Sequence, residues 1–256
     1  MKLLPLNAFS DNYIWLLHDR HQALVVDPGD AQPVLDALHR EQVQLQAILV
    51  THHHADHTGG VDALRQASGA TVFGPASEPV PAPLQALRGG QTLQALGLTW
   101  QVIEVPGHTA GHLAFYCPQV DGPGLLFCGD TLFSAGCGRI FEGTPQQMQH
   151  SLEQLAALPA STRVCSAHEY TLSNLKFALE VDPDNAALQR YHAQCQQLRA
   201  AGQPTLPSSI AVEAAINPFL RSTAPAITAA VLAHDGPAAQ RLGVFGALRE
   251  WKNNFR

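Results

Sequence analysis

Four histidines and one aspartate lie within positions 52–57, directly after an apolar run. The segment is His52-His53-His54-Ala55-Asp56-His57, preceded by Ile48-Leu49-Val50. Imidazole nitrogens and carboxylate oxygens are the side-chain ligands of zinc and related divalent cations. If the apolar run is a strand, His52 and His54 point the same way and His53 points away, because strand side chains alternate between faces. The segment predicts a metal site, with two nitrogen ligands for one cation and an oxygen–nitrogen pair for a neighbouring cation.

Three further apolar runs also end in a residue type that binds metals. The residues that follow these runs are His108, Asp130 and His168. Strand ends of an α/β sheet line one rim of a cavity, which is where such proteins bind ligands. A single histidine of this kind is more often a hydrogen-bonded core residue, but the coincidence at four strand ends favours a shared site. The alternative for residues 52–57 is a loose, solvated tract that scavenges metal. An internal position after a buried-looking strand disfavours it.

The elements that must position these residues form two kinds of pattern. Up to about residue 168, short β-like runs alternate with helical patterns, which is typical of a layered α/β fold. We expect strands over 13–17, 23–26 and 71–73, and helices over 33–41 and 61–67. A further helix is expected to begin at Thr144, where Thr144 and Gln147 together predict an N-terminal capping box. After His168 the patterns are helical only, over 171–181, 186–201, 208–215 and 237–252. This change predicts a domain boundary near residue 170.

Composition limits the class of protein. The chain has 256 residues, of which 46% are hydrophobic and 14% charged, as in ordinary globular proteins. No apolar stretch approaches the roughly 20 residues that span a bilayer, and because polar residues follow Leu6 we expect a first strand there rather than a secretory leader. The net charge of −6 argues against a nucleic-acid surface. The five cysteines have no paired spacing, which favours thiols in a reducing cytoplasm.

The pattern His52-x-His54-x-Asp56-His57, followed by His108, Asp130 and His168, resembles that of the metallo-β-lactamase fold. Nearly the whole chain resembles, more narrowly, the glyoxalase II (hydroxyacylglutathione hydrolase) family. The resembling segments span residues 9–15, 26–29, 51–60, 129–133, 136–139, 168–171, 174–178 and 217–221, and Arg249-x-x-Lys252. The resemblance implies an αββα sandwich over residues 1–170 as the catalytic domain. It also implies a smaller all-helical C-terminal domain over residues 171–256 that binds substrate.

The resemblance also implies how the metal ligands divide. One cation is bound by His52, His54 and His108, the other by Asp56, His57 and His168, and Asp130 bridges them. A bridging carboxylate holds two cations about 3.5–4 Å apart and lets a shared water lose its proton near neutral pH. We therefore expect two divalent ions per chain, a metal-bound hydroxide as the nucleophile and no catalytic side chain beyond it. The nitrogen and oxygen ligands suit zinc best, and iron or manganese also fit.

Three residues near these ligands have open roles. Asp27 closes the strand run at 23–26 and could accept the second N–H of a ligating imidazole. His53 is expected to be a buried histidine that forms hydrogen bonds. His112 either supports a ligand or belongs to the next strand.

Five residues are expected to meet the substrate. Arg139, Tyr170, Arg249 and Lys252 match positions that contact glutathione in the resembled family, and Phe141 stands where that family often has tyrosine. The family often has lysine in place of Arg139, so the charge is kept but the geometry differs. Arg249 and Lys252 share a helix face and could grip one carboxylate, although a solvated helix end is the alternative.

The implied reaction is hydrolysis of the thioester S-D-lactoylglutathione, and of related 2-hydroxyacylglutathiones, to glutathione and D-lactate, which detoxifies methylglyoxal. We expect a cytoplasmic monomer that acts on a small glutathione thioester and binds neither nucleic acid nor membrane. Rival functions with the same early motif are a persulfide dioxygenase with one iron, a lactonase and an RNA nuclease. A metal-binding module without turnover is the non-enzymatic alternative.

Overall fold

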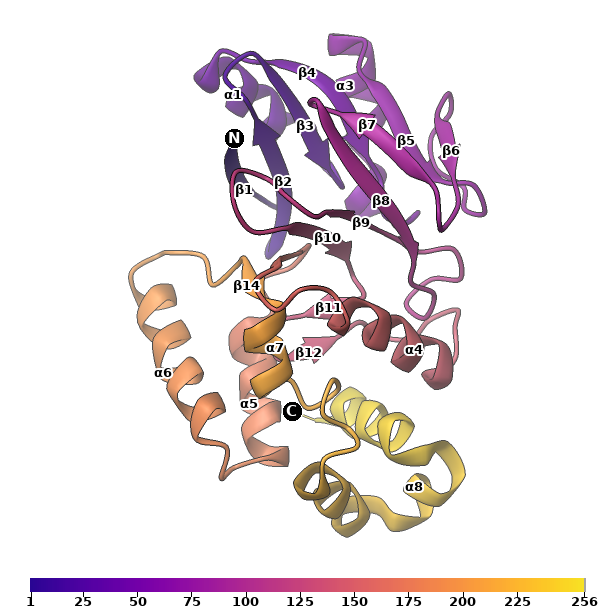
Figure 1. Cartoon of the computed structure of the whole chain (residues 1–256), viewed down its shortest axis with the longest axis vertical. Coiled ribbons are helices and arrows are strands. Elements are labelled where there is room, and N and C mark those ends of the chain that lie inside the picture. Colours follow the sequence, from indigo (N-terminus) through magenta and orange to yellow (C-terminus); the bar gives the residue numbers. More distant parts are fainter. Residues whose placement is uncertain (256) are drawn as a thin grey trace.

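The computed structural model describes residues 1–255, and two packed β-sheets form its upper half in Figure 1. The first sheet has six strands in chain order: β1 (Lys2–Ala8), β2 (Asn12–His18), β3 (Gln22–Val26), β4 (Gln44–Leu49), β5 (Thr71–Pro75) and β6 (Gln85–Leu87). Strands β1 to β3 pair antiparallel, whereas β3 to β6 pair parallel. Parallel neighbours need crossover connections. The β3–β4 connection carries helix α1 (Gln32–Glu41), the β4–β5 connection carries α2 (Ala55–Thr58) and α3 (Val61–Ser68), and the β5–β6 connection is a loop.

The second sheet also has six strands, and its order is not that of the chain. It runs β14 (Ser208–Ser209), β13 (Arg163–Ser166), β10 (Leu125–Gly129), β9 (Leu113–Cys117), β8 (Leu98–Glu104) and β7 (Thr92–Ala95). A short hairpin, β11 (Leu132–Phe133) and β12 (Gly136–Cys137), follows β10, and helix α4 (Pro145–Ala156) comes next.

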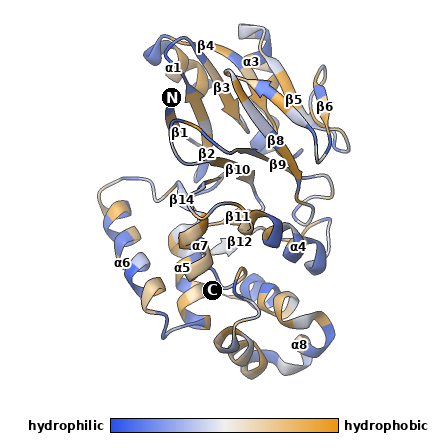
Figure 2. Ribbon diagram, in the orientation of Figure 1, coloured by the Kyte–Doolittle hydropathy of each residue, from blue (hydrophilic) through white to orange (hydrophobic). Residues whose placement is uncertain are grey.

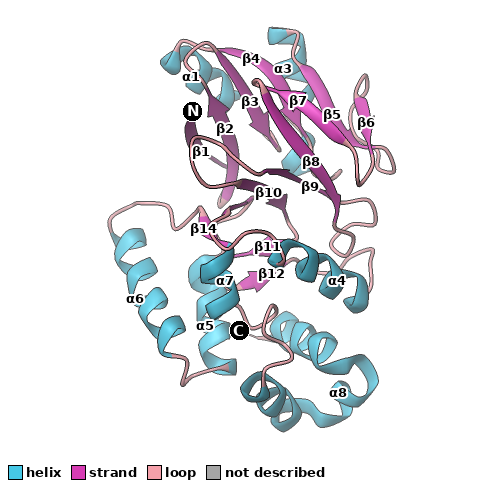
Figure 3. Ribbon diagram, viewed as in Figure 1, coloured by secondary structure: helices cyan, strands magenta, loops and turns pink. Residues whose placement is uncertain are grey.

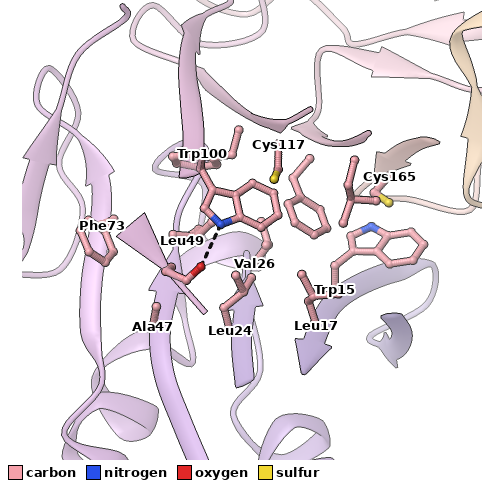
Figure 4. Close-up of a cluster of buried hydrophobic side chains, with 14 of the residues drawn as sticks. Trp15, Leu17, Leu24, Val26, Ala47, Leu49, Phe73, Trp100, Cys117 and Cys165 are labelled. Atoms are coloured by element: carbon pink, nitrogen blue, oxygen red, sulfur yellow. Dashed lines mark hydrogen bonds between the residues drawn. The ribbon is translucent and has the colours of Figure 1, made fainter. Parts of the chain in front are cut away.

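The main core lies between the two sheets. Trp15 of the first sheet and Trp100 of the second are both almost fully buried in this core (Figure 4). Trp100 stacks on Phe127 with ring centroids 5.4 Å apart. The outer face of the first sheet is covered by α1 and α3, through Val34 and Leu64 among others. The outer face of the second sheet is covered by α4 and by helices of the C-terminal half. This αββα arrangement confirms the predicted fold class.

The C-terminal half is helical, as the cyan ribbons of Figure 3 show. Its helices are α5 (Thr171–Val181), α6 (Ala186–Ala200), α7 (Ile210–Ile216) and α8 (Pro225–Asn254). Figure 2 shows blue and orange stretches alternating along α6, while the strands of the sandwich are largely orange. None of the helices in residues 1–255 is long and apolar enough to cross a membrane.

Several local predictions need correction. The C-terminal half is not purely helical, because β14 pairs antiparallel with β13 and so extends the second sheet. Strand β6 and the helix over 225–234 were not predicted. Helix α8 is interrupted at Asp235 and Gly243, where the backbone leaves helical geometry. The capping box at Thr144 is confirmed, with reciprocal bonds between Thr144 and Gln147. The domain division near residue 170 stays a prediction, and residue 256 lies outside the described residues.

Candidate metal centre

The four predicted ligand segments meet at one edge of the sandwich. His52 to His57 follow β4, His108 follows β8, Asp130 follows β10 and His168 follows β13. Strand β4 ends at Leu49, so the expectation that alternation along a strand pairs His52 with His54 is wrong. The two rings converge for another reason: His54 is the N-cap of α2, and the turn into this short helix redirects the chain.

A glycine is required immediately before Asp130. Gly129 has φ of +47°, a conformation that residues with a Cβ rarely adopt. A Cβ at this position would lie 2.4 Å from the Thr51 Oγ1 and 2.8 Å from the His112 ring. Gly129 therefore lets β10 end close against the histidine loop.

Three imidazole nitrogens form the first group of potential ligands. The Nδ1 of His54 lies 3.1 Å from the Nε2 of His52 and 3.1 Å from the Nε2 of His108. All three donor atoms lie within 4.8 Å of one another. A cation placed among them would be reached by three neutral nitrogens.

Asp56, His57 and His168 form the second group, whose donor atoms also lie within 4.8 Å of one another. Asp130 lies between the groups. Its Oδ2 is 3.4 Å from the Nε2 of His108, while its Oδ1 is 3.6 Å from the Nε2 of His57 and 3.3 Å from that of His168. One carboxylate thus presents an oxygen to each group, as a bridging ligand must.

The rings of His108 and His168 are oriented by oxygen atoms that contact their Nδ1 atoms. The Nδ1 of His108 is 2.7 Å from the carbonyl oxygen of Arg139, and the Nδ1 of His168 is 2.8 Å from the Oδ1 of Asp11. Because each oxygen can only accept, both rings carry their proton on Nδ1. Their Nε2 atoms therefore face the centre and are the ring nitrogens available to a cation.

Asp27 orients the other two rings. Its Oδ2 lies 3.1 Å from the Nδ1 of His57 and accepts a hydrogen bond of 2.7 Å from the Thr51 hydroxyl. That hydroxyl is left to accept from the Nδ1 of His52, 3.0 Å away. The geometry agrees with the predicted position of Asp27 behind a histidine. The Thr51 hydroxyl, held by Asp27, in turn orients the ring of His52.

The residues present fit a pair of bound cations. The Nε2 of His57 and the Oδ1 of Asp130 are buried and have no hydrogen-bond partner among residues 1–255. Buried polar atoms without partners are costly, so atoms of this kind that converge indicate a ligand. All the donors are nitrogen or oxygen, which suits zinc, iron or manganese.

The two groups differ in their protonation. Burial lowers the pKa of His52, His54 and His108, which favours neutral, ligating imidazoles. Burial also opposes protonation of His57, but the carboxylates of Asp130 and Asp27 outweigh it and raise the His57 pKa.

The pKa values of the two carboxyl groups, Asp56 and Asp130, are lowered, in contrast to that of His57. The pKa of Asp56 is lowered, chiefly by its hydrogen bond with His57. The pKa of Asp130 is lowered by the charges of His57 and His168, although burial opposes this. The carboxylates are thus ionised and able to bind a cation that replaces protons on the imidazoles.

His53 and His112 lie beside the two groups. The backbone N–H of His53 donates to Glu78 at 2.8 Å, and its Nδ1 lies 3.0 Å from the same carboxylate. His53 is only partly buried, which differs from the expectation of a buried ring. His112 is fully buried, stacks on His52 with centroids 4.6 Å apart, and accepts from the backbone N–H of Asp130 at 3.2 Å. It therefore supports the position of two proposed ligands.

Two cavities adjoin the centre and share a wall. The metal-side cavity, about 310 Å³, is lined by Phe141 and by five of the seven proposed ligands, namely His54, Asp56, His108, Asp130 and His168. The cation-lined cavity, about 240 Å³, is lined by Cys137, Arg249 and Lys252. Phe133, Arg139 and Tyr170 line both cavities. A larger cavity of about 420 Å³, lined by Phe9, Asp11 and Arg199 among others, contains none of the proposed imidazoles.

The predicted substrate residues lie around these cavities. Tyr170 stacks on His168 with centroids 4.7 Å apart, and Phe141 is exposed with its ring 5.2 Å from that of His108. Arg249 is buried, and its Nη1 donates to the carbonyl oxygen of Cys137 at 2.9 Å. Burial and the nearby charge of Arg249 lower the pKa of Lys252 to about 8.

Several residues of the site were not given a role from the sequence. Asp11 and Thr51 lie beside the Nδ1 atoms of imidazoles proposed as ligands, Asn12 donates to the Oδ2 of Asp56 at 3.0 Å, and Phe133 lines both cavities. Asp11, Asn12 and Phe133 lie in segments that carry the family resemblance, and this resemblance was the sequence feature that could have identified them as site residues. Nothing in their local sequence identifies the partners.

Two family models together match residues 9–255. Residues 9–168 match the model described as "Metallo-beta-lactamase superfamily", and residues 169–255 match "Hydroxyacylglutathione hydrolase C-terminus". Three relatives named hydroxyacylglutathione hydrolase match over nearly their whole length. The protein of Albidiferax ferrireducens is 64% identical over 255 residues and that of Cupriavidus taiwanensis 55% over 265, each with 100% of both chains covered. The protein of Pseudomonas aeruginosa PAO1 is 53% identical over 262 residues, with 98% of each chain covered.

Solved structures of more distant proteins share the fold. ETHE1 from Myxococcus xanthus has a TM-score of 0.67 and 24% identity, covering 100% of this chain and 92% of that one. TTHA1623, solved in a di-iron-bound form, has a TM-score of 0.61 and 25% identity, covering 86% of this chain and 100% of that one.

Proposed function

Because the chain belongs to the hydroxyacylglutathione hydrolase family, we propose that it hydrolyses S-D-lactoylglutathione and related 2-hydroxyacylglutathiones to glutathione and D-lactate. The observation that carries this proposal is the common wall of the two cavities. One cavity adjoins the converging metal donors, and the other presents Arg249 and Lys252 to an anionic ligand. A thioester of glutathione has the matching chemistry, with a reactive carbonyl at one end and carboxylates at the other.

We propose His52, His54 and His108 as ligands of one cation, Asp56, His57 and His168 as ligands of the other, and Asp130 as the bridge. Two such cations would supply Lewis acidity and lower the pKa of water, so that no side-chain nucleophile is needed. Zinc is the proposed metal, because nitrogen and oxygen donors suit it, and iron and manganese remain alternatives.

The chain's own residues have separate roles in this reaction. Asp11, Thr51 and Asp27 fix the ligating rings. The side chains of Arg139 and Tyr170 border both cavities and are proposed to hold the substrate where they meet, with Phe141 beside the reacting end. The leaving thiolate has a parent pKa of about 8.5, so it departs with little help from a general acid.

The helical half is proposed to bind the glutathione moiety. Arg249 and Lys252 lie three positions apart on α8 and both line the cation-lined cavity. The proposed division is catalysis by residues 1–170 and substrate binding by residues 171–256. In the cell, the reaction would remove methylglyoxal after its conversion to the thioester. All five cysteines are buried and free, which supports a reducing, cytoplasmic location. We propose a monomer that uses neither nucleic acid nor membrane.

The direct test is hydrolysis of S-D-lactoylglutathione by the full chain, compared with a thioester of the same acid on a thiol that lacks the glutathione carboxylates. We expect hydrolysis of both, with a much lower KM for the glutathione thioester. Absence of glutathione release would contradict the proposal. Oxygen consumption with glutathione persulfide would instead support a dioxygenase.

A further inference from the structure

The β11–β12 hairpin carries part of the cavity wall and is bound by side chains of the helical half. The hairpin pairs Leu132 with Cys137 and Phe133 with Gly136. Phe133 and Cys137 line the cavities, and Arg139 follows two residues after the hairpin. The position of this short hairpin therefore affects the substrate site on both sides of the shared wall.

The turn of the hairpin is strained. Ala135 has φ of +55°, in the left-handed region that costs free energy for a residue with a Cβ. Two strands of two residues each provide few internal hydrogen bonds to offset that cost. A conformation of this kind persists only when surrounding groups hold it.

Glu213 of α7 is the central holding group. Its side chain is fully buried, and its Oε2 accepts a hydrogen bond of 2.8 Å from the backbone N–H of Ala135. Because water cannot solvate the carboxylate at this buried position, the pKa of Glu213 is raised. Burying an acid costs folding free energy unless hydrogen bonds compensate for its lost hydration. Glu213 is remote from the proposed metal ligands, so a bound cation does not supply that compensation.

Asn217, one turn further along the chain, binds the same hairpin. Its Nδ2 lies 3.1 Å from the carbonyl oxygen of Phe133, 2.9 Å from that of Gly136 and 3.1 Å from the Oε2 of Glu213. The two amide hydrogens are therefore shared among three oxygens. Its Oδ1 accepts from the backbone N–H of Phe219 at 3.0 Å, which fixes the amide in this orientation.

Side chains of two further helices also form hydrogen bonds with the hairpin. Asn174 of α5 donates to the carbonyl oxygen of Ser134 at 3.1 Å, and Arg249 of α8 donates to that of Cys137 at 2.9 Å. Side chains from three helices thus bind the carbonyl oxygens of residues 133, 134, 136 and 137 and the N–H of residue 135.

We propose that Glu213 and Asn217 are positioning residues, which hold the strained β11–β12 turn so that Phe133 and Arg139 form the wall shared by the two cavities. Neither side chain lines a cavity, so both act through the hairpin. This inference rests on the proposed function for its kinetic consequence. The structural part does not depend on the reaction.

The test compares metal-loaded full-length variants at Glu213. Glu213→Ala removes the acceptor, whereas Glu213→Gln keeps a carbonyl oxygen that can accept from Ala135. Glu213→Asp shortens the side chain, so that its carboxylate no longer reaches the N–H of Ala135. It replaces the alanine variant in the comparison if that variant does not fold. Ser209→Ala is the matched control, because Ser209 caps α7 through the N–H of Val212 and does not contact the hairpin.

Three quantities are measured: KM and kcat for S-D-lactoylglutathione, bound metal per chain, and hydrogen exchange of the Ala135 amide. For Glu213→Ala, or for Glu213→Asp in its place, we expect KM to rise about tenfold with kcat within about twofold of wild type. Bound metal should be unchanged, and the Ala135 amide should exchange at least about tenfold faster. Glu213→Gln should restore both values to near wild type.

The contrary results are equally specific. If Ser209→Ala raises KM as much as Glu213→Ala, loss of helix stability explains the effect and the positioning role is refuted. Unchanged exchange at Ala135 in Glu213→Ala also refutes it. If the wild-type protein does not hydrolyse the thioester, the proposed function fails, and the exchange rates of the variants still decide the inference.

Discussion

The Oδ2 of Asp27 lies 3.1 Å from the Nδ1 of His57, and both side chains are buried. Asp27 is itself fixed by Thr51, whose backbone N–H and hydroxyl each donate to it at 2.7 Å. One carboxylate at the end of β3 therefore sets the orientation of a proposed ligand on α2. This relationship connects the first sheet directly to the second donor group.

Replacing Asp27 by asparagine should weaken the second metal site. The neutral amide attracts the His57 imidazole less than the carboxylate does and can turn its NH₂ toward the ring, so His57 loses its fixed orientation. Loss of a contact behind a ligand typically costs about 10–100-fold in metal affinity or activity. Metal content and kcat of Asp27→Asn should both fall, whereas Asp36→Asn, on the exposed face of α1, should change neither. Full metal content together with full turnover would remove the role of Asp27.

Installing the missing hydroxyl at residue 141 should tighten substrate binding. Phe141 is 58% exposed and lines the metal-side cavity, so a tyrosine can be accommodated there. Phe141→Tyr should lower KM by about threefold and leave kcat nearly unchanged, because the added contact is equal in ground and transition states. Phe9→Tyr, at another exposed phenylalanine, is the control. An unchanged KM would count against a substrate role for residue 141.

The affinity for substrate should depend on pH through Lys252. Burial, assisted by the charge of Arg249, lowers the Lys252 pKa to about 8, so this residue is cationic below that pH and neutral above it. A neutral amine attracts a glutathione carboxylate less, and KM should therefore rise by about tenfold as pH increases through this pKa.

Lys252→Arg provides the comparison for that profile. A guanidinium stays charged over the same range, so the rise in KM near pH 8 should be absent in the variant. Identical pH profiles for the two proteins would show that Lys252 does not bind the substrate carboxylate.

Loss of the capping box on α4 should reduce stability without affecting chemistry. Thr144 and Gln147 satisfy each other's backbone N–H groups, and α4 packs Met148 and Leu152 under the second sheet. Thr144→Ala should lower the free energy of unfolding by about 1 kcal/mol. Denaturant unfolding measures this change, with Gln146→Ala, at an exposed position of the same helix, as the control. Equal stability of Thr144→Ala and wild type would contradict it.

The sequence predicted the elements whose signals are local. His108, Asp130 and His168 could be placed at a common rim because each follows an apolar strand, and Thr144 could be placed at a helix start because its partner is three residues away. Asp11 could not be paired with His168, since 157 positions separate them and only the folded sheets bring them together. The same limit applies to Glu213 and Ala135, which are 78 positions apart.

Short or irregular elements were missed for a different reason. Strand β14 has two residues and forms only through its pairing with β13. Strand β6 follows a proline-rich stretch whose composition indicates a loop. The interruption of α8 at Gly243 lies within an apparently continuous helical pattern. Tertiary contacts outweigh local preference at each of these positions.

Titration of metal-depleted protein with zinc, with thioester hydrolysis followed at each addition, tests the central claim most directly. If the seven side chains hold two cations, hydrolysis should be absent after chelation and should reach its maximum at two equivalents of zinc per chain. Full activity without metal, or a maximum at one equivalent, would contradict the dinuclear centre.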